Sequence, residues 1–188
     1  MGPGFDLSGP GSVGFTREVP ENENTFEGNA LLKASALYAH CSKLFGEGAV
    51  GCFADDSGLE VDALGGAPGV WSARYAGETD PGLRDQANIQ LLLRRMEGFT
   101  EQTARRARFR TVVAFVHRGR HWFFEGKVEG YIAFEPKGSG GFGYDPVFVP
   151  EGSAKHFSEL TMEEKNRISH RGEAVRRFAE FLQSYRED

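Results

Sequence analysis

The chain has 188 residues and a formal net charge of −5, from 22 Lys and Arg against 27 Asp and Glu. This length fits one domain, or one domain with a small lobe. The negative charge argues against nucleic acid as the main partner, but a small phosphorylated ligand needs only a few basic side chains. No stretch approaches the roughly 20 apolar residues that span a bilayer, and no signal peptide opens the sequence. We therefore expect a soluble, cytoplasmic protein without a membrane or nucleic-acid partner.

The two cysteines, Cys41 and Cys52, are too few for a disulfide framework and are not spaced as zinc ligands. Cys52 lies in an apolar run, so we interpret it as a small buried side chain. The cysteines indicate neither a disulfide scaffold nor a zinc site.

The first part of the chain predicts an irregular arm followed by a helix and a strand. Residues 1–15 are rich in Gly and Pro and show no periodicity, so we predict an arm over residues 1–20 and a single domain over residues 21–188. Apolar residues at helical spacing predict a helix from Thr25 to about Leu44. The apolar run 49–54 predicts a buried strand that ends in a polar turn.

The rest of the chain predicts further helices and strands. A second helix is expected from Pro81, with Pro in its first turn. Alternating apolar residues over 108–117 predict a strand that is buried on both faces. Residues 122–124 and 130–134 predict two more strands, paired as a hairpin around Gly126, and a final helix is expected from about Glu173. The predicted fold class is α/β, with a long mixed sheet.

Two adjacent acids follow the first apolar run, in the segment FADDSGLEVDALGGAPGVWSARYAGE. At the end of a buried strand, Asp55 and Asp56 put at least one carboxylate at a sheet edge, where α/β proteins bind ligands. Mg²⁺ is typically held by one or two carboxylates plus substrate phosphates. A carboxylate there can also deprotonate water for attack on phosphorus. The alternative is a simple turn with helix-capping residues.

A glycine-rich segment, GSGGFGYDPVFVP, covers residues 138–150. Its glycines let backbone approach a ligand closely, and Phe142 and Tyr144 offer flat faces for a purine ring. Asp145 can accept a hydrogen bond from a base N–H. The alternative is a Gly-rich hairpin turn with core aromatics.

Two further segments carry charges next to helix ends. In LTMEEKNRISHRG, Thr161 and Glu164 resemble a capping box. The donors that follow, around the turn that opens the last helix, suit a phosphate or a base carbonyl, although a solvated basic face is the alternative. Glu21 precedes the first helix, and spacing alone does not distinguish a metal ligand from a helix-dipole partner. The donors of the first segment are Lys165, His170 and Arg171.

In combination and in this order, these segments resemble the inosine triphosphate pyrophosphatase family, the Ham1-like proteins. The resemblance runs from about Glu21 to the C-terminus and is densest in ADDSGLEVDALGGAPGVWSARYAGE, GGFGYDPVF and EEKNRISHRG. It implies an elongated α/β fold with a central mixed sheet flanked by helices, two lobes with a nucleotide cleft between them, and a homodimer. The implied reaction is Mg²⁺-dependent hydrolysis of ITP, dITP and XTP to the monophosphate and pyrophosphate.

The resemblance also implies roles for individual residues. The catalytic, metal-binding aspartate of the family matches Asp56, and Ser57 beside it contacts substrate. The upstream metal-associated glutamate matches Glu21. Lys165 is expected to help offset the charge of the leaving pyrophosphate. The expected substrate-binding residues are Ser57, Phe142, Gly143, Tyr144, Asp145, Lys165, His170 and Arg171.

The start of the chain departs from the family pattern. Relatives open with a buried strand and a Thr/Ser-x-Asn-x-x-Lys loop that grips the triphosphate, whereas the first lysine here is Lys33, inside the predicted helix. We therefore expect a chain that is N-terminally truncated or replaced by about 30 residues. Two alternatives remain open: a Maf-like nucleotide pyrophosphatase, and a catalytically impaired nucleotide-binding protein.

Overall fold

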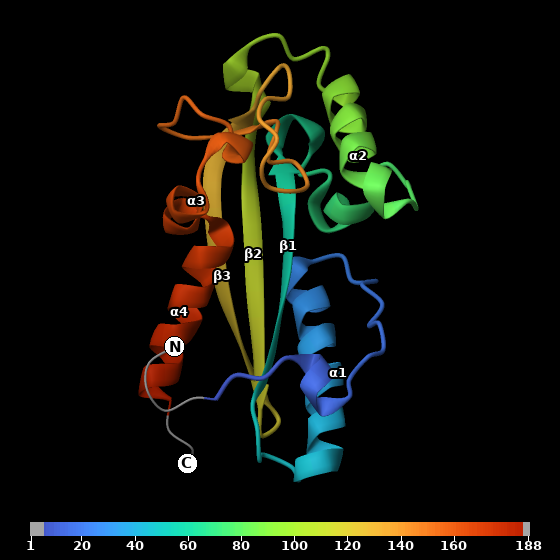
Figure 1. Cartoon of the computed structure of the whole chain (residues 1–188), viewed down its shortest axis with the longest axis vertical. Helices are drawn as coiled ribbons and strands as arrows, with labels where there is room; N and C mark the ends of the chain where they lie inside the picture. The colour runs from blue at the N-terminus through green and yellow to red at the C-terminus, as the bar shows by residue number, and fades with distance from the viewer. Residues whose placement is uncertain (1–5, 186–188) are drawn as a thin grey trace. The chain divides into compact units, whose positions relative to one another are not determined.

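A computed structural model describes residues 6–185 and shows an α/β fold (Figure 1). A four-stranded sheet has the strand order β1-β2-β3-β4, and four α-helices flank it. The predicted α/β class is confirmed, but the four strands are antiparallel, where the sequence predicted a mixed sheet. None of the described helices is long and apolar enough to cross a membrane. The elements are α1 (Phe26–Phe45), β1 (Cys52–Val61), α2 (Pro81–Arg95), β2 (Arg106–His117), β3 (Arg120–Ile132), β4 (Phe148–Pro150), α3 (Met162–Ile168) and α4 (His170–Ser184).

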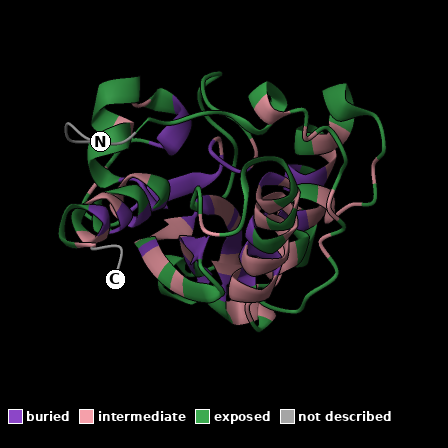
Figure 2. Ribbon diagram, turned by 90° about the horizontal axis from the view of Figure 1, so that it is seen from below, coloured by how far each residue is buried: buried purple, intermediate pink, exposed green. Residues whose placement is uncertain are grey.

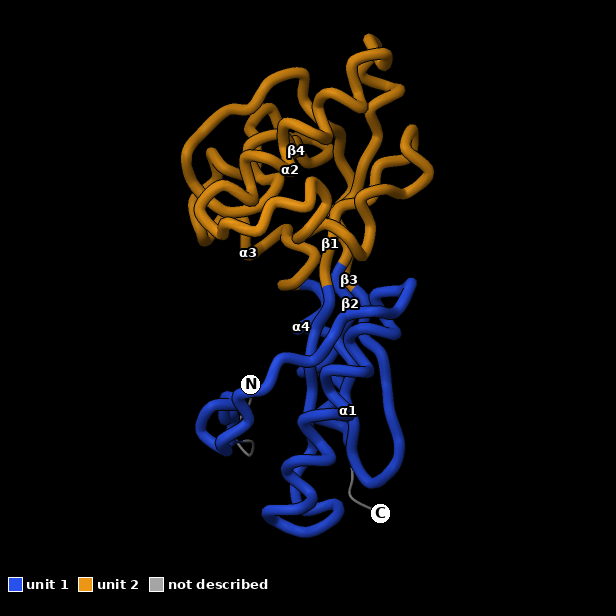
Figure 3. Tube along the Cα trace, turned by 90° about the vertical axis from the view of Figure 1, so that its right-hand side faces the viewer, with its two compact units in different colours: residues 1–56, 111–125, 173–188 blue, residues 57–110, 126–172 orange. Residues whose placement is uncertain are grey.

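The chain divides into two compact units (Figure 3). Unit 1 takes the chain up to Asp56, residues 111–125, and the chain from Glu173. Unit 2 takes residues 57–110 and 126–172. Strands β1, β2 and β3 therefore each contribute residues to both units, and Asp56 and Ser57 are neighbours across a division within β1.

In unit 1, helices α1 and α4 cover opposite faces of the strands. Phe178 of α4 packs against Phe53 of β1 and Phe115 of β2, with ring centroids 5.0 and 5.3 Å apart. Because neighbouring residues of a strand point to opposite faces, Cys52 and Asp56 face the other way, toward α1. Helix α1 begins after Thr25, whose hydroxyl accepts a hydrogen bond from the Gly28 N–H, as an N-cap residue does.

In unit 2, a second apolar core joins α2 to the strands. Within unit 2, Ala107 and Phe109 of β2 are buried and Arg108 between them is half-buried; Figure 2 colours each residue by its burial. Strand β4 pairs with β3 at Gly130, where a Cβ would lie 2.3 Å from the Val149 carbonyl oxygen, so the pairing requires glycine. The buried residues of this core are Leu59, Val61, Ile89, Leu92, Met96, Ala107, Phe109, Ile132, Tyr144, Val147, Phe148 and Phe157.

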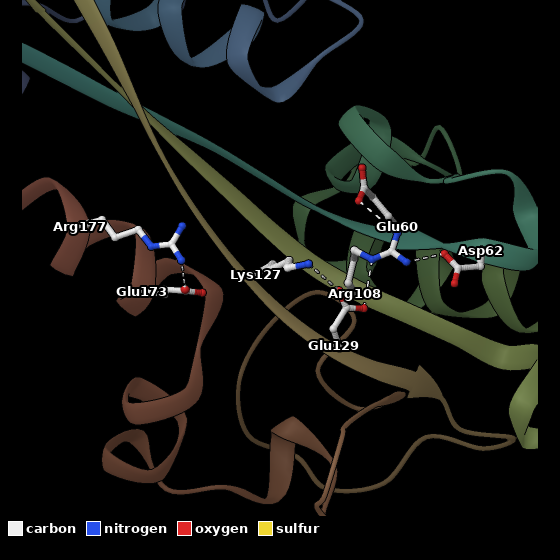
Figure 4. A network of polar contacts seen from close by, with 7 residues as sticks. All are labelled: Glu60, Asp62, Arg108, Lys127, Glu129, Glu173 and Arg177. Carbon is white, nitrogen blue, oxygen red and sulfur yellow. Dashed lines mark hydrogen bonds and ion pairs between the residues drawn. The ribbon is translucent and has the colours of Figure 1, made fainter.

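A network of ion pairs crosses three strands within unit 2 (Figure 4). The Arg108 guanidinium on β2 donates to Glu129 on β3 at 3.2 Å and to Asp62 at 2.7 Å. It also lies 3.7 Å from the Glu60 carboxylate on β1, and Lys127 lies 3.3 Å from Glu129. Opposite charges on neighbouring strands stabilise the pairing of those strands.

The first strand is longer than predicted. The expected polar turn at residues 55–58 is wrong, because β1 continues through Asp55, Asp56, Ser57 and Gly58 to Val61. Asp and Gly are depleted in strands, so composition favoured a turn. The alternation of side chains continues nevertheless, with Asp56 and Gly58 buried.

The predicted hairpin around Gly126 is also wrong, because Gly126 lies inside the single strand β3. The turn between β2 and β3 is formed by Arg118 and Gly119, with φ angles of 48° and 71°. Two successive positive φ angles are typical of the tight turns that match strand twist. Arg is rarely found at positive φ, so its residue type did not indicate a turn at this position.

The described part of the N-terminal arm, from residue 6, holds the 3-10 helix Pro10–Val13, and residues 6–25 form no strand. The Val13 carbonyl accepts a hydrogen bond from His40 Nε2 of α1 at 2.8 Å, and the Phe15 ring meets the His40 ring edge-on. Residues 1–5 of the predicted arm lie outside the described residues.

Candidate active site

Unit 1 contains a group of polar residues around Asp56. Lys33 Nζ on α1 donates to Asp56 Oδ1 at 3.0 Å and to Glu21 Oε1 at 2.7 Å. Asn29, one helical turn before Lys33, donates to the other Asp56 oxygen at 3.2 Å. Asp56 is only 8% exposed, so these donors replace the water that a buried carboxylate loses.

Sequence reasoning identified Asp56 and Glu21 but missed Asn29 and Lys33. The two missed residues lie four apart on the α1 face that also buries Phe26, Ala30 and Ala34. A polar pair at this spacing within an apolar helix face was the signal that could have revealed them. Asn29 is fully buried, and its Oδ1 accepts the Glu23 N–H at 3.0 Å.

The electrostatics of this group favour a proton-accepting role for Asp56. Burial raises the pKa of Asp56 above its ordinary value, and the opposing effects of Lys33 and Asn29 do not fully cancel the rise. A carboxylate with a raised pKa is a stronger base. Burial lowers the pKa of Lys33, but its hydrogen bonds to Glu21 and Asp56 outweigh burial, so that pKa is raised and Lys33 stays positively charged.

The two carboxylates suit a hard divalent cation. Glu21 Oε1 and Asp56 Oδ1 both lie within 3.0 Å of a single cationic atom, Lys33 Nζ, so the side chains direct their oxygens at one point. Among the described residues, no cluster of three or more His, Cys, Asp or Glu could hold a metal. A pair of carboxylates with the remaining positions left to water and phosphate oxygens is typical of Mg²⁺ rather than of an all-protein metal site.

Unit 2 contains a second candidate group of residues, in the loop between β3 and β4. Asp145 is 2% exposed, and its Oδ2 accepts hydrogen bonds from the Phe142 N–H at 2.9 Å and from Lys165 Nζ. Gly143 has a φ of 58°, a conformation that favours glycine. The Phe142 side chain is 64% exposed, with Lys165 Nζ 4.8 Å from its ring centroid. The loop therefore presents the exposed Phe142 ring, and Lys165 of α3 places a positive charge beside it.

Tyr144 differs from the expectation that it offers a face to a ligand. Its ring is 3% exposed, and its hydroxyl donates to the Ser72 carbonyl at 3.0 Å. Burial raises the pKa of Tyr144 far above its ordinary value, so the hydroxyl stays protonated as a donor. The Tyr144 ring belongs to the unit 2 core, so Tyr144 anchors the loop to that core.

The remaining predicted residues lie around the start of α4. The helix begins at His170, three residues before the predicted start, and Ser169 Oγ accepts the Gly172 N–H at 3.1 Å. The His170 ring is 9% exposed and stacks on Phe109 at 4.9 Å. The exposed Arg171 guanidinium lies 3.5 Å from Ser57 Oγ on β1. The structure therefore brings Ser57 and Arg171 together.

Cavities elsewhere in unit 2 do not coincide with these residues. One, of about 450 Å³, is lined by Arg94, Arg105 and Phe134 among others. Another, of about 440 Å³, includes Arg106 and Tyr131. The buried Arg105 donates to four backbone carbonyls at the ends of α2 and β3, which explains its burial structurally.

Comparison with known sequences places these residues in a family. The sequence model described as "Ham1 family" matches residues 5–181. The chain is 45% identical to the "dITP/XTP pyrophosphatase" of Bacillus subtilis (strain 168), over 96% of this chain and 86% of that protein. It is 49% identical to the protein of the same name from Porphyromonas gingivalis, over 94% of this chain and 85% of that one.

Solved structures give the same result. The Ham1 protein of Staphylococcus aureus superposes with a TM-score of 0.78 at 40% identity, over 89% of this chain and 81% of that one. A HAM1 protein from Coxiella burnetii gives a TM-score of 0.82 at 34% identity, over 94% and 85%. The similarity thus extends over most of the chain.

Proposed function

Because the chain belongs to the Ham1 family, we propose that it hydrolyses deaminated purine nucleoside triphosphates, ITP, dITP and XTP, to the monophosphate and pyrophosphate. The observation that carries this proposal is Asp56, a buried carboxylate with a raised pKa that Lys33 and Asn29 hold in place. Relatives named for dITP/XTP hydrolysis support the substrate class. The match over residues 5–181 favours this function over the Maf-like alternative.

Asp56 is proposed as the catalytic base. It accepts a proton from water as the water oxygen bonds to the α-phosphorus, and the bond from that phosphorus to the bridging oxygen breaks. Pyrophosphate leaves with the bonding electron pair. Burial and the fixed donors Lys33 and Asn29 keep the carboxylate oriented, which reduces the reorganisation that the reaction requires.

We propose Mg²⁺ as the cofactor, held by Asp56 and Glu21. When bound, it would supply positive charge to the phosphates and to the leaving group. Support comes from the closeness of the two carboxylates, which both pair with Lys33 and offer oxygen ligands of the kind that Mg²⁺ takes. Lys33 balances the two negative charges and keeps them within a few ångströms of each other.

Base recognition is proposed for the β3–β4 loop and the start of α4. The exposed Phe142 ring would stack on the purine, with Gly143 and Tyr144 setting the loop backbone and Lys165 fixed by Asp145 beside the ring. Ser57, His170 and Arg171 would complete the contacts to substrate. A hydrogen-bond donor on the protein that faces the 6-keto oxygen of the substrate would face the 6-amino group, another donor, in adenine. Buried polar groups mismatched in this way discriminate strongly between the two bases.

We further propose a homodimer in the cytoplasm, on the basis of the family resemblance. Light scattering on the purified protein measures the oligomeric state directly. A monomeric mass at micromolar concentration would contradict the dimer and leave the proposed reaction in place.

The decisive experiment on the reaction is Asp56→Asn. Asparagine keeps the shape of the side chain but loses its basicity and charge, so we expect pyrophosphate release from ITP to fall at least about a thousandfold. Binding of ITP should survive at least in part, and calorimetry measures it. The control is Asp55→Asn, the neighbouring aspartate on the opposite face of β1, which should retain turnover. ITP turnover within threefold of the parent in Asp56→Asn would exclude Asp56 as base or metal ligand.

A further inference from the structure

Two successive backbone amides of the β3–β4 loop are held by carboxylates from different parts of unit 2. The Phe142 N–H donates to Asp145 Oδ2 within the loop, at 2.9 Å. The Gly143 N–H donates to Asp85 Oδ2 at 2.6 Å, and Asp85 lies on α2, 58 residues earlier in the chain. A hydrogen bond from an amide to an ionised carboxylate is shorter and stronger than one to a neutral acceptor.

Helix α2 also supports the next loop residue, Tyr144, indirectly. Asn88, about one turn after Asp85, donates to the Ser72 and Ala73 carbonyls at 3.2 and 3.3 Å. The same Ser72 carbonyl accepts the Tyr144 hydroxyl at 3.0 Å. One face of α2 therefore holds Gly143 directly and Tyr144 through the 3-10 helix Gly69–Arg74.

The loop needs such outside support. Its backbone has positive φ angles at Gly138, Gly141 and Gly143, of 74°, 76° and 58°. Glycines in these conformations leave many other backbone shapes accessible to the loop. Within the loop, the Asp145 side chain holds one backbone amide, that of Phe142. Asp85 of α2 independently holds the next amide, that of Gly143.

Neither capping of α2 nor packing in the apolar core explains the presence of an aspartate at position 85. The helix already has Asp80 as N-cap, with its Oδ1 accepting the Gly82 N–H at 2.8 Å. Asp85 is exposed on the surface and contributes nothing to the apolar core. Its contact with the Gly143 N–H instead stabilises the conformation of the loop that carries the exposed Phe142 ring.

We propose that Asp85 is a positioning residue for recognition of the purine base, acting through Gly143 on Phe142. This inference rests on the proposed function, because it assigns the control of base selectivity to a residue outside the binding loop. Loss of the Asp85 carboxylate would let the Gly143 peptide rotate, and the neighbouring Phe142 ring would lose its fixed position. Hydrolysis itself, at Asp56, would be little affected.

The test compares Asp85→Ala, Asp85→Asn and the control Gln86→Ala, an exposed neighbour on the same helix. The measurement is kcat and KM for ITP and for ATP in each protein. We expect Asp85→Ala to lower the ITP-to-ATP ratio of kcat/KM by about tenfold, the effect of losing one charge-assisted hydrogen bond, through a higher KM for ITP with kcat within threefold. Asp85→Asn keeps an accepting oxygen and should stay within about threefold of the parent ratio, and Gln86→Ala should match the parent.

The outcomes separate this inference from the proposed function. A parent protein without a preference for ITP over ATP would overturn both. A parent that prefers ITP, with an Asp85→Ala ratio within twofold of it, would overturn the role of Asp85 alone. If Asp85→Ala fails to fold, amide hydrogen exchange on the parent decides: the Gly143 N–H should exchange slowly, and exchange at the rate of an unstructured amide would overturn the contact.

Discussion

At the scale of single residues, Lys33 determines how the carboxylates of unit 1 are held. Its ammonium group forms two charge-assisted hydrogen bonds, to Glu21 and to Asp56, with a side chain that is 23% exposed. Without it, two carboxylates directed at one point would repel each other and turn apart. The lysine therefore serves the geometry of the candidate catalytic group as well as its charge balance.

We predict that Lys33→Met lowers kcat/KM for ITP by roughly ten- to a hundredfold, because the lost charge-assisted hydrogen bond to Asp56 contributes ~1.5–3 kcal/mol. Methionine keeps the apolar stem, so folding should be preserved. Lys33→Arg should recover part of the activity, and Lys43→Met, at an exposed position of the same helix, should change nothing. Parent-like kcat/KM in Lys33→Met, at an unchanged melting temperature, would contradict this role.

Some residues of the candidate site could be predicted from the sequence and others could not. An acidic pair after an apolar run is a local pattern that indicated Asp55 and Asp56, and the family resemblance selected Asp56. Asn29 and Lys33 could not be predicted, because their importance comes from the packing of α1 against the β1 face that carries Asp56. Asp85 was missed for the same reason, since its partner lies 58 residues away.

At the scale of elements, close packing at the start of β1 limits which residues fit. A Cβ on Gly51 would lie 2.4 and 2.5 Å from atoms of the Phe115 ring. That ring is itself enclosed by Phe178 and Trp122, at centroid distances of 5.3 and 5.6 Å. Neither the ring nor the strand can move away without disturbing the unit 1 core.

We therefore expect Gly51→Ala to destabilise the protein by ~1–3 kcal/mol, the cost of overpacking a well-filled core. For a chain of this size, Tm falls by roughly 2–4 °C per kcal/mol. Gly98→Ala is the matched control, because nothing lies within 4 Å of the added Cβ. Equal melting temperatures of the two variants would show that the Phe115 ring adjusts freely.

Helix α3, which carries Lys165, depends on its capping box. Glu164 accepts the Thr161 N–H at 2.8 Å, and Thr161 Oγ1 accepts the Glu164 N–H at 3.2 Å. The hydrogen bonds from the Thr161 backbone and side chain, with the charge of Lys155, hold the pKa of Glu164 below its ordinary value. A carboxyl with a depressed pKa stabilises the folded state above its unfolded pKa, and this contribution is lost as pH falls through the folded pKa.

The predicted consequence is a pH-dependent effect of Glu164→Gln. The variant should be less stable than the parent at pH 7, and the difference should shrink below about pH 4, as Glu164 of the parent becomes protonated. Urea unfolding at pH 7 and at pH 3 measures both differences. Glu163→Gln, which removes only an exposed pair with Arg167, serves as control. A difference that stays constant over this range would show that the charge of Glu164 does not stabilise the cap.

At the scale of the whole molecule, the sequence predicted the α/β class, the positions of the long helices and strand β2, because these have strong hydrophobic periodicity. It did not predict that β1 passes through Asp56 or that β3 is one strand of 13 residues. Polar residues interrupt both patterns, and they are tolerated because neighbouring elements supply partners such as Lys33 for Asp56 and Arg108 for Glu129. Those partners are distant in sequence, so composition within a local window favours turns.

The proposed function also has a consequence for the stability of the molecule as a whole. A ligand that binds only the folded chain stabilises it, by about 2.7 kcal/mol at a concentration of 100 times its Kd. In Asp56→Asn, which should bind ITP without hydrolysing it, saturating ITP should raise Tm by about 5–10 °C.

ATP at the same concentration should raise Tm by less, because the residues proposed to read the base should disfavour the 6-amino group. Phe142→Ala combined with Asp56→Asn is the control and should reduce the ITP shift, since the exposed Phe142 ring is the one proposed to stack on the purine. Equal shifts for ITP and ATP in Asp56→Asn would mean that recognition reads the phosphates and not the base, and the substrate assignment would then be wrong.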